Sequence, residues 1–361
     1  MKSTIHLFLF LLAGFSHVTV CQEMTDMQDT LIAEQTVAVL PSKSGFDFFA
    51  SDAPLEITLR FDIREFLKTK NKQEYQDALM TIRISESDSI SQAIKLRSRG
   101  FMRLSYCSFP PIMLKFNRDE ENKPIQAKGT LKLVTHCTKS AVFERYVFKE
   151  YLTYKLYNLV TPYSFRTRLV KITYQDSGKS AEAFTEYGFL IENEEQMAAR
   201  NNAVVINTTN ISQKNMNATD MARVAVFNYM IGNTDWSVPY QHNIKVLKSL
   251  SGVSDTGIPV AYDFDYSALV NTMYSAPPEQ LPIKSVMERY YMGLCFEDEK
   301  IKPVLDEFSG MQEELMGVIH DFEYLSKAEK KQVELYIKGF YSMYRNQNIL
   351  ISDLNRTCKQ Y

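Results

Sequence analysis

From Leu55 onward the chain alternates hydrophobic and polar residues, a pattern typical of a strand with one buried face. In "LEITLRFD" the residues Leu55, Ile57, Leu59 and Phe61 share one face. Four later segments repeat this alternation between polar or Pro/Gly breaks: "LMTIRIS", "AIKLRSRG", "IMLKFN" and "TLKLVTHC". Residues 55–137 are therefore predicted to form an antiparallel β region of about five strands.

A helical period replaces the alternation at Val142. Apolar residues recur three and four positions apart through "VFERYVFKEYLTYKLYNLV", and Pro162 ends the segment. Two predicted strands, "TRLVKITYQ" and "EYGFLIEN", then flank a turn-rich loop. A second helix is predicted in "TDMARVAVFNYMIGN", with Thr219 or Asp220 as N-cap and Gly232 as the left-handed C-terminal residue.

The last part of the chain predicts two more strands, "HNIKVLKSL" and "IPVAYDFD", followed by amphipathic helices. A β-rich region followed by a mainly helical one indicates an α+β fold. We expect four segments: a signal peptide at 1–21, a polar leader at 22–50, a β-rich lobe with one helix at 51–195, and a mainly helical lobe at 196–361.

The first residues predict export. Lys2 precedes an apolar run, "IHLFLFLLAGF", that is too short to span a bilayer, and "SHVTVCQE" then turns polar as a signal peptide does near its cleavage site. Cleavage after Cys21 would give an exported mature chain with no transmembrane helix. The alternative is a lipoprotein in which Cys21 is lipidated, although the small residues usual before such a cysteine are missing.

Export leaves Cys107, Cys137, Cys295 and Cys358 in an oxidising compartment, where disulfides are stable. The preferred pairing is Cys107–Cys137 with Cys295–Cys358, because the first two lie in the same β-rich region. Four free, buried cysteines are the alternative. The formal net charge of −2 argues against a nucleic-acid-binding protein, which needs a basic excess.

Polar residues gather where the second helix ends and two strands meet, in "GNTDWSVPYQHNIKVL" and "YDFDYSALV". If those strands form a hairpin, Asn243 lies beside Asp263. An amide oxygen with the carboxylates of Asp263 and Asp265 would suit Mg²⁺ or Mn²⁺. Asp235 would reach the same point as a general base or an orienting carboxylate. Ordinary turn chemistry at a strand end is the alternative interpretation.

This order of Asp, Asn and Asp is the layout of ATP-dependent phosphotransfer. The chain resembles the spore-coat-protein-H (CotH) kinase-like family of secreted atypical kinases. The similar segments are "IKLRSRGFMRLSYCSFPPIMLKFN", "LKLVTHCTKSAVFERYVFKEYLTYKL", "LVKITYQ…EYGFLIENEE", "GNTDWSVPYQHNIKVL" and "VAYDFDYSALV". The resemblance implies a bilobal protein-kinase-like fold, with a β-rich N-terminal lobe and a mainly helical C-terminal lobe. It also implies ATP with Mg²⁺ or Mn²⁺ as cofactors.

The resemblance assigns roles to the polar residues at the strand ends. Asp235 would be the catalytic-loop aspartate. Asn243 would be a metal ligand, Asp263 the main metal ligand and Asp265 a second metal or water ligand.

It also assigns a nucleotide-binding set. Lys115 would contact the ATP phosphates, Glu150 or Glu144 would pair with that lysine from the helix, and Glu192 would lie near the nucleotide at the interlobe connection. The family's "PKK" is "SFPPIMLK" here, so Lys115 lacks its usual neighbouring lysine. The phosphate-binding loop has only Gly100.

The arginines around Gly100 would supply the missing positive charge or form a solvated strand face; they are Arg97, Arg99 and Arg103. The predicted function is that of an exported kinase that transfers the ATP γ-phosphate to a hydroxyl of a protein or small molecule. The alternative is a non-catalytic envelope or secreted binding protein. A secreted metal hydrolase is disfavoured, because the chain has no His-rich cluster and no Gly-x-Ser-x-Gly elbow.

Overall fold

The computed structural model describes residues 46–360 except 117–124, 126–128, 179–180 and 253–254. All described residues fall in one structural unit, Pro41–Tyr361. The predicted signal peptide, Cys21 and most of the predicted leader lie outside them. Residues 46–50, the end of the predicted leader, are described, and Phe48 is buried in the core beneath the β-strands.

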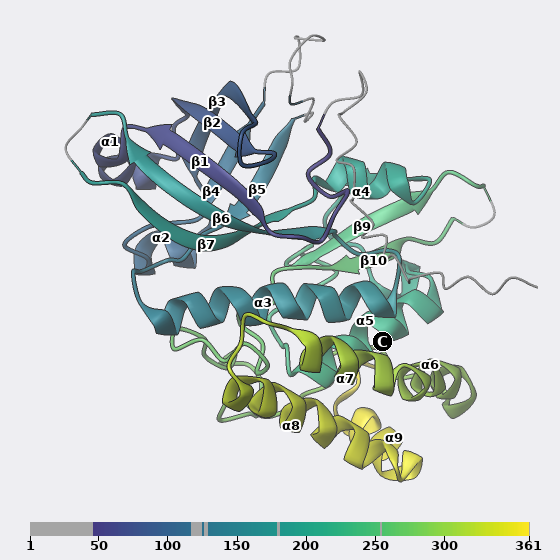
Figure 1. Ribbon diagram of the computed structural model, residues 1–361. Helices are drawn as coiled ribbons and strands as arrows, with labels where there is room; N and C mark the ends of the chain where they lie inside the picture. Colours follow the sequence, from purple (N-terminus) through teal and green to yellow (C-terminus); the bar gives the residue numbers. More distant parts are fainter. Residues whose placement is uncertain (1–45, 117–124, 126–128, 179–180, 253–254, 361) are drawn as a thin grey trace, which may run out of the picture. The chain divides into compact units, whose positions relative to one another are not determined.

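Seven strands close into a barrel in the order β1-β2-β3-β4-β5-β7-β6 (Figure 1). They are β1 (Leu55–Phe61), β2 (Gln76–Arg83), β3 (Ser89–Ser98), β4 (Ile112–Lys115), β5 (Thr130–Val134), β6 (Thr167–Asp176) and β7 (Phe184–Ile191). Neighbouring strands are antiparallel, and the pair of β1 and β6 is the exception, being parallel. Closure therefore pairs both edges of each strand.

The alternation of β1 explains why it forms a barrel wall. Leu55, Ile57, Leu59 and Phe61 are buried in the interior, and the residues between them are partly or fully exposed. The other strands contribute in the same way to one core, whose fully buried members include Met80, Ile82, Leu96, Leu114, Leu133 and Ile172. The five predicted strands of residues 55–137 and the predicted hairpin of β6 and β7 are confirmed.

The predicted bilobal protein-kinase-like fold is wrong. The strands do not form the open sheet of a separate N-terminal lobe but a closed barrel within a mixed α/β structure. The parallel pairing of β1 with β6 closes the barrel, from Leu55 opposite Val170 to Phe61 opposite Asp176. The period of two determines which face of a strand is buried, but it does not determine which strand lies beside it. The expected boundary at 195–196 falls inside α4 (Glu194–Arg200).

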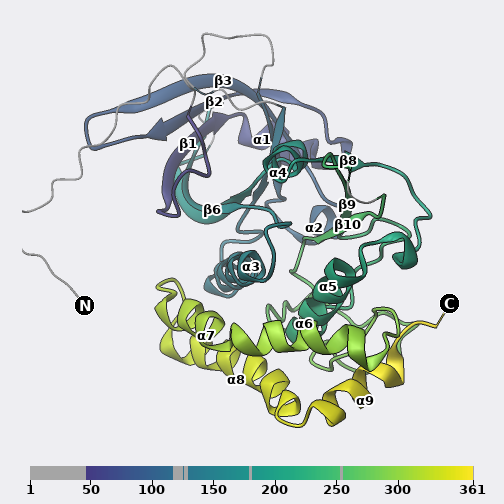
Figure 2. The same cartoon turned by 90° about the vertical axis from the view of Figure 1, so that its right-hand side faces the viewer.

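Helix α3 (Ala141–Val160) lies between the barrel and the C-terminal helices in both views (Figures 1 and 2). It packs against β6 and β7 on one side and against α7 on the other. Its N-cap is Ser140, whose hydroxyl accepts a hydrogen bond from the Val142 N–H. Residues around most of its circumference are buried, as expected for a central helix.

The remaining helices lie between strands or follow the last strand. They are α1 (Ile63–Lys68), α2 (Met102–Tyr106), α5 (Ala218–Ile231), α6 (Asp298–Gly310), α7 (Gln312–Asp321), α8 (Lys327–Tyr344) and α9 (Gln347–Thr357), with 3₁₀ turns η1 (Lys70–Lys72) and η2 (Gln213–Asn215). Within the described ranges, no helix is long and apolar enough to cross a membrane.

A second sheet has the order β10-β9-β8, formed by β8 (Ala203–Ile206), β9 (Ile244–Ser249) and β10 (Ile258–Ala261). β9 and β10 are antiparallel, with Ile244 opposite Ala261, so the predicted hairpin is confirmed. Helix α5 packs on β10 and ends at Gly232, whose φ of 65° confirms the predicted left-handed position. Its N-cap is Asn217, not Thr219 or Asp220, because the Asn217 side chain accepts from the Asp220 N–H.

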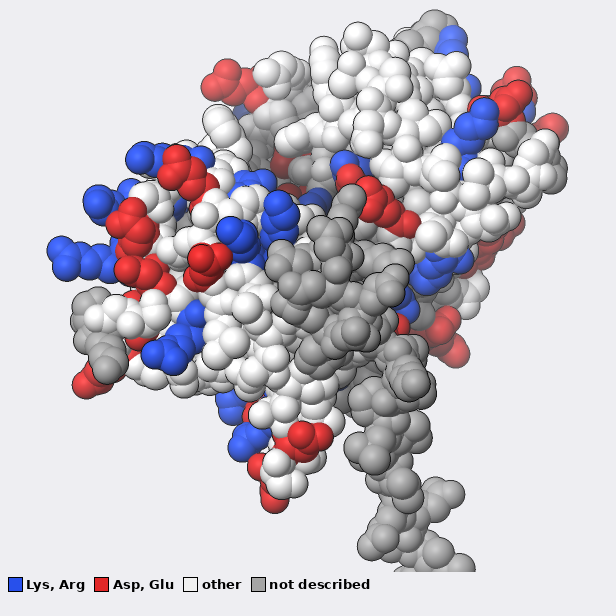
Figure 3. Space-filling view, turned by 90° about the horizontal axis from the view of Figure 1, so that it is seen from above, with Lys and Arg blue, Asp and Glu red and all other residues white. Residues whose placement is uncertain are grey.

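Two disulfides, Cys107–Cys137 and Cys295–Cys358, confirm the preferred pairing. They close loops with sequence separations of 30 and 63 residues. Loop-closure entropy gives each a stabilisation of about 4 kcal/mol. On the face seen in Figure 3, acidic and basic side chains are interspersed, as the near-zero net charge leads one to expect.

We predict that His136 makes the barrel acid-sensitive. Its ring is 1% exposed and stacks on Phe109, and its Nδ1 has no hydrogen-bond partner among the described residues. Burial, with the charges of Lys139 and Arg103, lowers the pKa of His136 to about 4. The unfolded chain takes up this proton at a higher pH than the folded chain. The stability that depends on a neutral His136 is therefore complete above pH ~6.5. It is lost as the pH falls towards ~4, about 3 kcal/mol in all.

Urea unfolding at pH 7 and pH 4.5 tests this prediction. His136→Phe should lose clearly less stability than the wild type between the two pH values. An equal loss in both proteins would assign the acid sensitivity to other groups.

Candidate functional site

The stretch Asp263-Phe264-Asp265 follows β10 and is anchored by its central residue. Phe264 is fully buried, and its ring lies 4.9 Å from that of Tyr154 and 5.7 Å from that of Phe227, between ring centroids. An aromatic side chain buried in this way holds its neighbours in place. The two flanking aspartates are therefore fixed at the end of the strand.

Helix α3 also binds the backbone of this stretch. The Asp263 N–H donates to the Tyr154 hydroxyl over 2.8 Å, and the Ala261 N–H donates to the Tyr157 hydroxyl over 3.3 Å. Asp263 and Asn243 have φ values of 63° and 52°, in the left-handed region that non-glycine residues rarely adopt. Such strained positions concentrate at functional sites.

Asp235 is held at the same strand ends by its neighbours. Its carboxylate is 2.8 Å from His242 Nε2 and accepts from Asn243 Nδ2 over 2.9 Å. Its N–H donates to Asn233 Oδ1, and the Asn233 side chain is in turn bonded to Asn228 of α5. The hydrogen bond of the His242 ring to the Asp235 carboxylate is the main cause that raises the pKa of His242. The side chain of Asp235 remains 32% exposed, so a ligand can reach it.

The carboxylates of Asp263 and Asp265 repel each other. Asp265 is 6% exposed and accepts a hydrogen bond from the Tyr274 hydroxyl over 2.9 Å. Burial and the neighbouring Asp263 raise the pKa of Asp265 to about 7, although Arg103 and Tyr274 act in the opposite direction. Asp263 makes no side-chain hydrogen bond or ion pair with any residue in the part of the chain that the structure describes. Two acidic groups so placed favour a cation between them.

Glu150 pairs with Arg103 and not with Lys115. The Arg103 guanidinium is 3.6 Å from Glu150 Oε2, and both side chains are buried. Burial raises the pKa of Glu150 well above its usual range, and Arg103 opposes that rise. The Lys115 ammonium lies over the Tyr75 ring, 5.1 Å from its centroid. The predicted ion pair of Lys115 with Glu150 is therefore wrong. Glu144, the alternative partner, is partly buried in the first turn of α3.

The lysine on which the charge of Asp263 acts is Lys132 of β5. Its ammonium lies 4.6 Å from the centroid of the Tyr262 ring. Burial and the positive charges of Arg99 and Lys245 lower the pKa of Lys132 to about 8, while Asp263 and Glu194 oppose the change. Leu131 and Leu133 point into the barrel, so Lys132 points outward from it.

A cavity of about 310 Å³ lies beside Lys132. It is lined from β4, from β5 and the residue before it, from β9, and from the start of α4 with the two residues before it, by Met113, Gly129, Thr130, Lys132, Glu192, Asn193, Glu194, Glu195 and Lys245. Glu192, predicted to lie near the nucleotide, is among these lining residues, but its carboxylate is paired: Arg166 and Arg200 each bind it at 2.9 Å. The buried Glu192 therefore joins the residue before β6 to the end of α4 through these two ion pairs.

The residues at the strand ends would suit a hard divalent cation whose coordination is completed by oxygens of a bound ligand. Asn243 gives its amide N–H to Asp235, which leaves its Oδ1 without a hydrogen bond to any described residue. Among the described residues, no group of three or more His, Cys, Asp or Glu side chains is arranged to hold a metal ion. Mg²⁺ is often held by one or two carboxylates, with phosphate and water supplying the rest. Asp263, Asp265 and Asn243 would supply the protein's share.

No protein-family model matches the chain, and no curated protein matches it in sequence.

Sequence reasoning predicted which polar residues lie together at the strand ends, but the lysine near them in the structure is Lys132 and not Lys115. Asp235, Asn243, Asp263 and Asp265 meet as predicted. Lys132 was missed because "TLKLV" shows only that Lys132 and Thr130 share an outward face, not that Tyr262 and Lys245 lie beside it. Arg103 was considered for a solvated strand face, yet it lies buried on α2.

We predict that Asp265 destabilises the fold without a bound cation. Because its folded pKa lies above that of the unfolded chain, its stabilising contribution is complete below pH ~4 and lost as the pH rises through about 7. In EDTA, Asp265→Asn should raise the free energy of unfolding by about 2 kcal/mol at pH 8 and by little at pH 4.

Thermal unfolding in EDTA measures this gain. Asp255→Asn is the control, because the Asp255 side chain is 99% exposed and should change stability little. A loss of stability in Asp265→Asn at pH 8 would show that the carboxylate stabilises the fold.

Proposed function

We propose that the protein binds a nucleoside triphosphate with Mg²⁺ or Mn²⁺ and transfers its γ-phosphate to a hydroxyl of a protein or small molecule. The observation that carries the proposal is the gathering of Asp235, Asn243, Asp263 and Asp265 at the strand ends, where Asp235 binds Asn243 and the charge of Asp263 acts on both Asp265 and Lys132. The proposal rests on these side chains and not on the fold, since folds host unrelated functions. Membership of the CotH-like family stays a prediction.

The proposed cation would be held by Asp263, Asp265 and Asn243 and would neutralise phosphate charge. Lys132, next to the cavity of about 310 Å³, would place a positive charge on the phosphates. That cavity is at the lower end of the volumes of ligand pockets. Its polar lining, with Glu194 and Lys245 in an ion pair of 2.6 Å, offers donors and acceptors for a nucleotide.

Asp235 would position the acceptor. His242 and Asn243 hold its carboxylate at the strand ends, and it stays partly exposed. An acceptor hydroxyl would give its proton to Asp235 as its oxygen bonds to the γ-phosphorus. The bond from that phosphorus to the bridging oxygen would break and leave the nucleoside diphosphate.

We also infer that the protein works outside the cytoplasm. The apolar N-terminal segment and the two disulfides support export, because disulfides persist in oxidising compartments.

Asp263→Ala should abolish Mn²⁺-dependent binding of ATP, because it removes the main proposed metal ligand, whose charge acts on both Lys132 and Asp265. Lys132→Met should weaken binding about tenfold, the loss of one charge-assisted contact to phosphate. Lys115→Met is the matched control and should leave the affinity unchanged. Isothermal titration with ATP and Mn²⁺ measures each dissociation constant. An oxidised wild-type protein that binds no nucleotide with either metal would sink the proposal.

Asp235→Asn should keep ATP binding but lower phosphate transfer by at least about 100-fold, as expected for loss of a general base. Transfer is measured with γ-labelled ATP and a mixed protein acceptor. If the wild type binds ATP and Mn²⁺ but transfers no label, the non-catalytic binding protein becomes the better description.

A further inference from the structure

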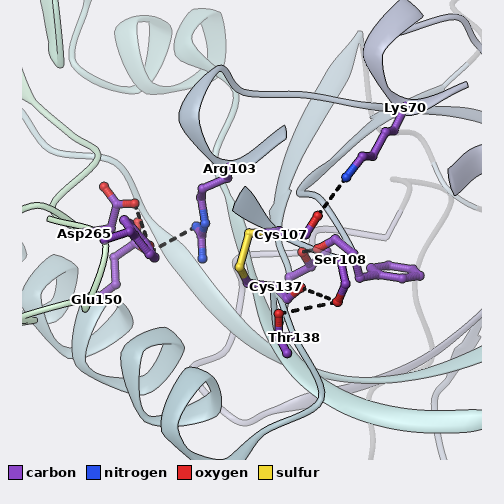
Figure 4. The surroundings of a disulfide bond; sticks show 11 residues. Lys70, Arg103, Cys107, Ser108, Cys137, Thr138, Glu150 and Asp265 are labelled. Atoms are coloured by element: carbon purple, nitrogen blue, oxygen red, sulfur yellow. Dashed lines mark hydrogen bonds and ion pairs between the residues drawn. A yellow bond between two sulfur atoms is a disulfide. The ribbon is translucent and has the colours of Figure 1, made fainter. Parts of the chain in front are cut away.

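We propose that Arg103 is a positioning residue of the carboxylate site and that the Cys107–Cys137 disulfide holds it there. The inference rests on the proposed function for its readout and adds a residue and a covalent constraint to that site. Figure 4 shows Arg103 between the two acids, Glu150 and Asp265, on one side and the Cys107–Cys137 disulfide on the other.

Arg103 is the cation that the buried acids share. Its side chain is 10% exposed and forms the ion pair with Glu150, which is 1% exposed. Burial by itself would lower the pKa of the Arg103 guanidinium. The nearby acidic side chains outweigh burial, so the pKa is raised; they are Tyr274, Glu150, Asp265 and Asp263. Without Arg103, Glu150 would be a buried acid with no ion-pair partner among the described residues. An uncompensated buried charge is costly, so its surroundings would rearrange.

Helix α2 is short, and apart from the disulfide and the Arg103 ion pair it is held by the ring contacts of Tyr106 with Phe143 and Tyr274. It has five residues and no side-chain N-cap, and its buried residues are Arg103 and Leu104. Gly100 precedes it with a φ of 95°, and Phe101 is 85% exposed. An isolated helix of this length is unstable in water.

The disulfide joins this helix to α3. The Cys107 N–H donates to the Arg103 carbonyl and ends α2. Cys137 lies in the connection between β5 and α3, just before the cap residue Ser140, and α3 carries Glu150. The disulfide therefore ties together the two elements that carry the ion pair. Lys70 adds one non-covalent contact, through a hydrogen bond to the Cys107 carbonyl.

Arg103 therefore acts through the carboxylates and does not bind metal itself. Loss of a partner that orients metal-binding carboxylates typically lowers metal affinity by about 10- to 100-fold. Arg103→Met should weaken Mn²⁺-dependent ATP binding by at least about tenfold, and Arg103→Lys should restore most of the loss because it keeps the charge.

A double-mutant cycle tests whether the disulfide acts through Arg103. Cys107→Ser with Cys137→Ser should weaken ATP binding about as much as Arg103→Met, and the combined variant should be no weaker than either. Cys295→Ser with Cys358→Ser is the matched control and should leave affinity unchanged. Additive losses, or an equal loss in the control, would overturn the proposal. If the Cys107 and Cys137 variant does not fold, the Arg103 variants decide: wild-type affinity in Arg103→Met overturns it.

Hydrogen exchange without nucleotide separates this proposal from the proposed function. Arg103→Met and the loss of Cys107–Cys137 should both speed exchange in residues 261–275, whereas loss of Cys295–Cys358 should not. If the wild type binds no ATP but exchange follows this pattern, the phosphotransferase proposal fails and the positioning role stands. Unchanged exchange in both variants overturns the positioning role.

Discussion

The site depends on the packing of Phe264 against the tyrosines of α3. That packing buries the centre of the Asp-Phe-Asp stretch, and the Tyr154 and Tyr157 hydroxyls bind the backbone on either side of Tyr262. Because α3 also packs on the barrel, one helix connects the barrel strands to the ends of β9 and β10. The aspartates gain a fixed geometry from apolar contacts that they do not make themselves.

The local elements could be predicted from the sequence because each depends on nearby residues. The alternation in β1 and the glycine at position 232 act within a few residues, and both appear where expected. The polar residues at the strand ends could be predicted because the β9–β10 hairpin is itself local. The cysteine pairing followed from the predicted region of each cysteine.

The remaining features arise from contacts between distant segments. Pairing of Leu55 with Val170 closes the barrel, and no pattern within β1 or β6 specifies its partner. The choice between Lys115 and Lys132 required knowing that Tyr262 and Lys245, distant in sequence, lie beside Lys132. The alternation in β4 and β5 places both lysines on an outward face, so it does not distinguish between them.

The parallel pairing of β1 with β6 also constrains how the chain folds. β1 cannot find its second neighbour until β6 has been made, and α3 and the Cys107–Cys137 crosslink lie between them in the sequence. During synthesis or export from the N-terminus, β1 to β5 would form a sheet whose β1 edge is still unpaired. Such an edge recruits other strands, and pairings between distant segments form slowly. A chain stalled before residue 176 should therefore aggregate more readily than one released at full length.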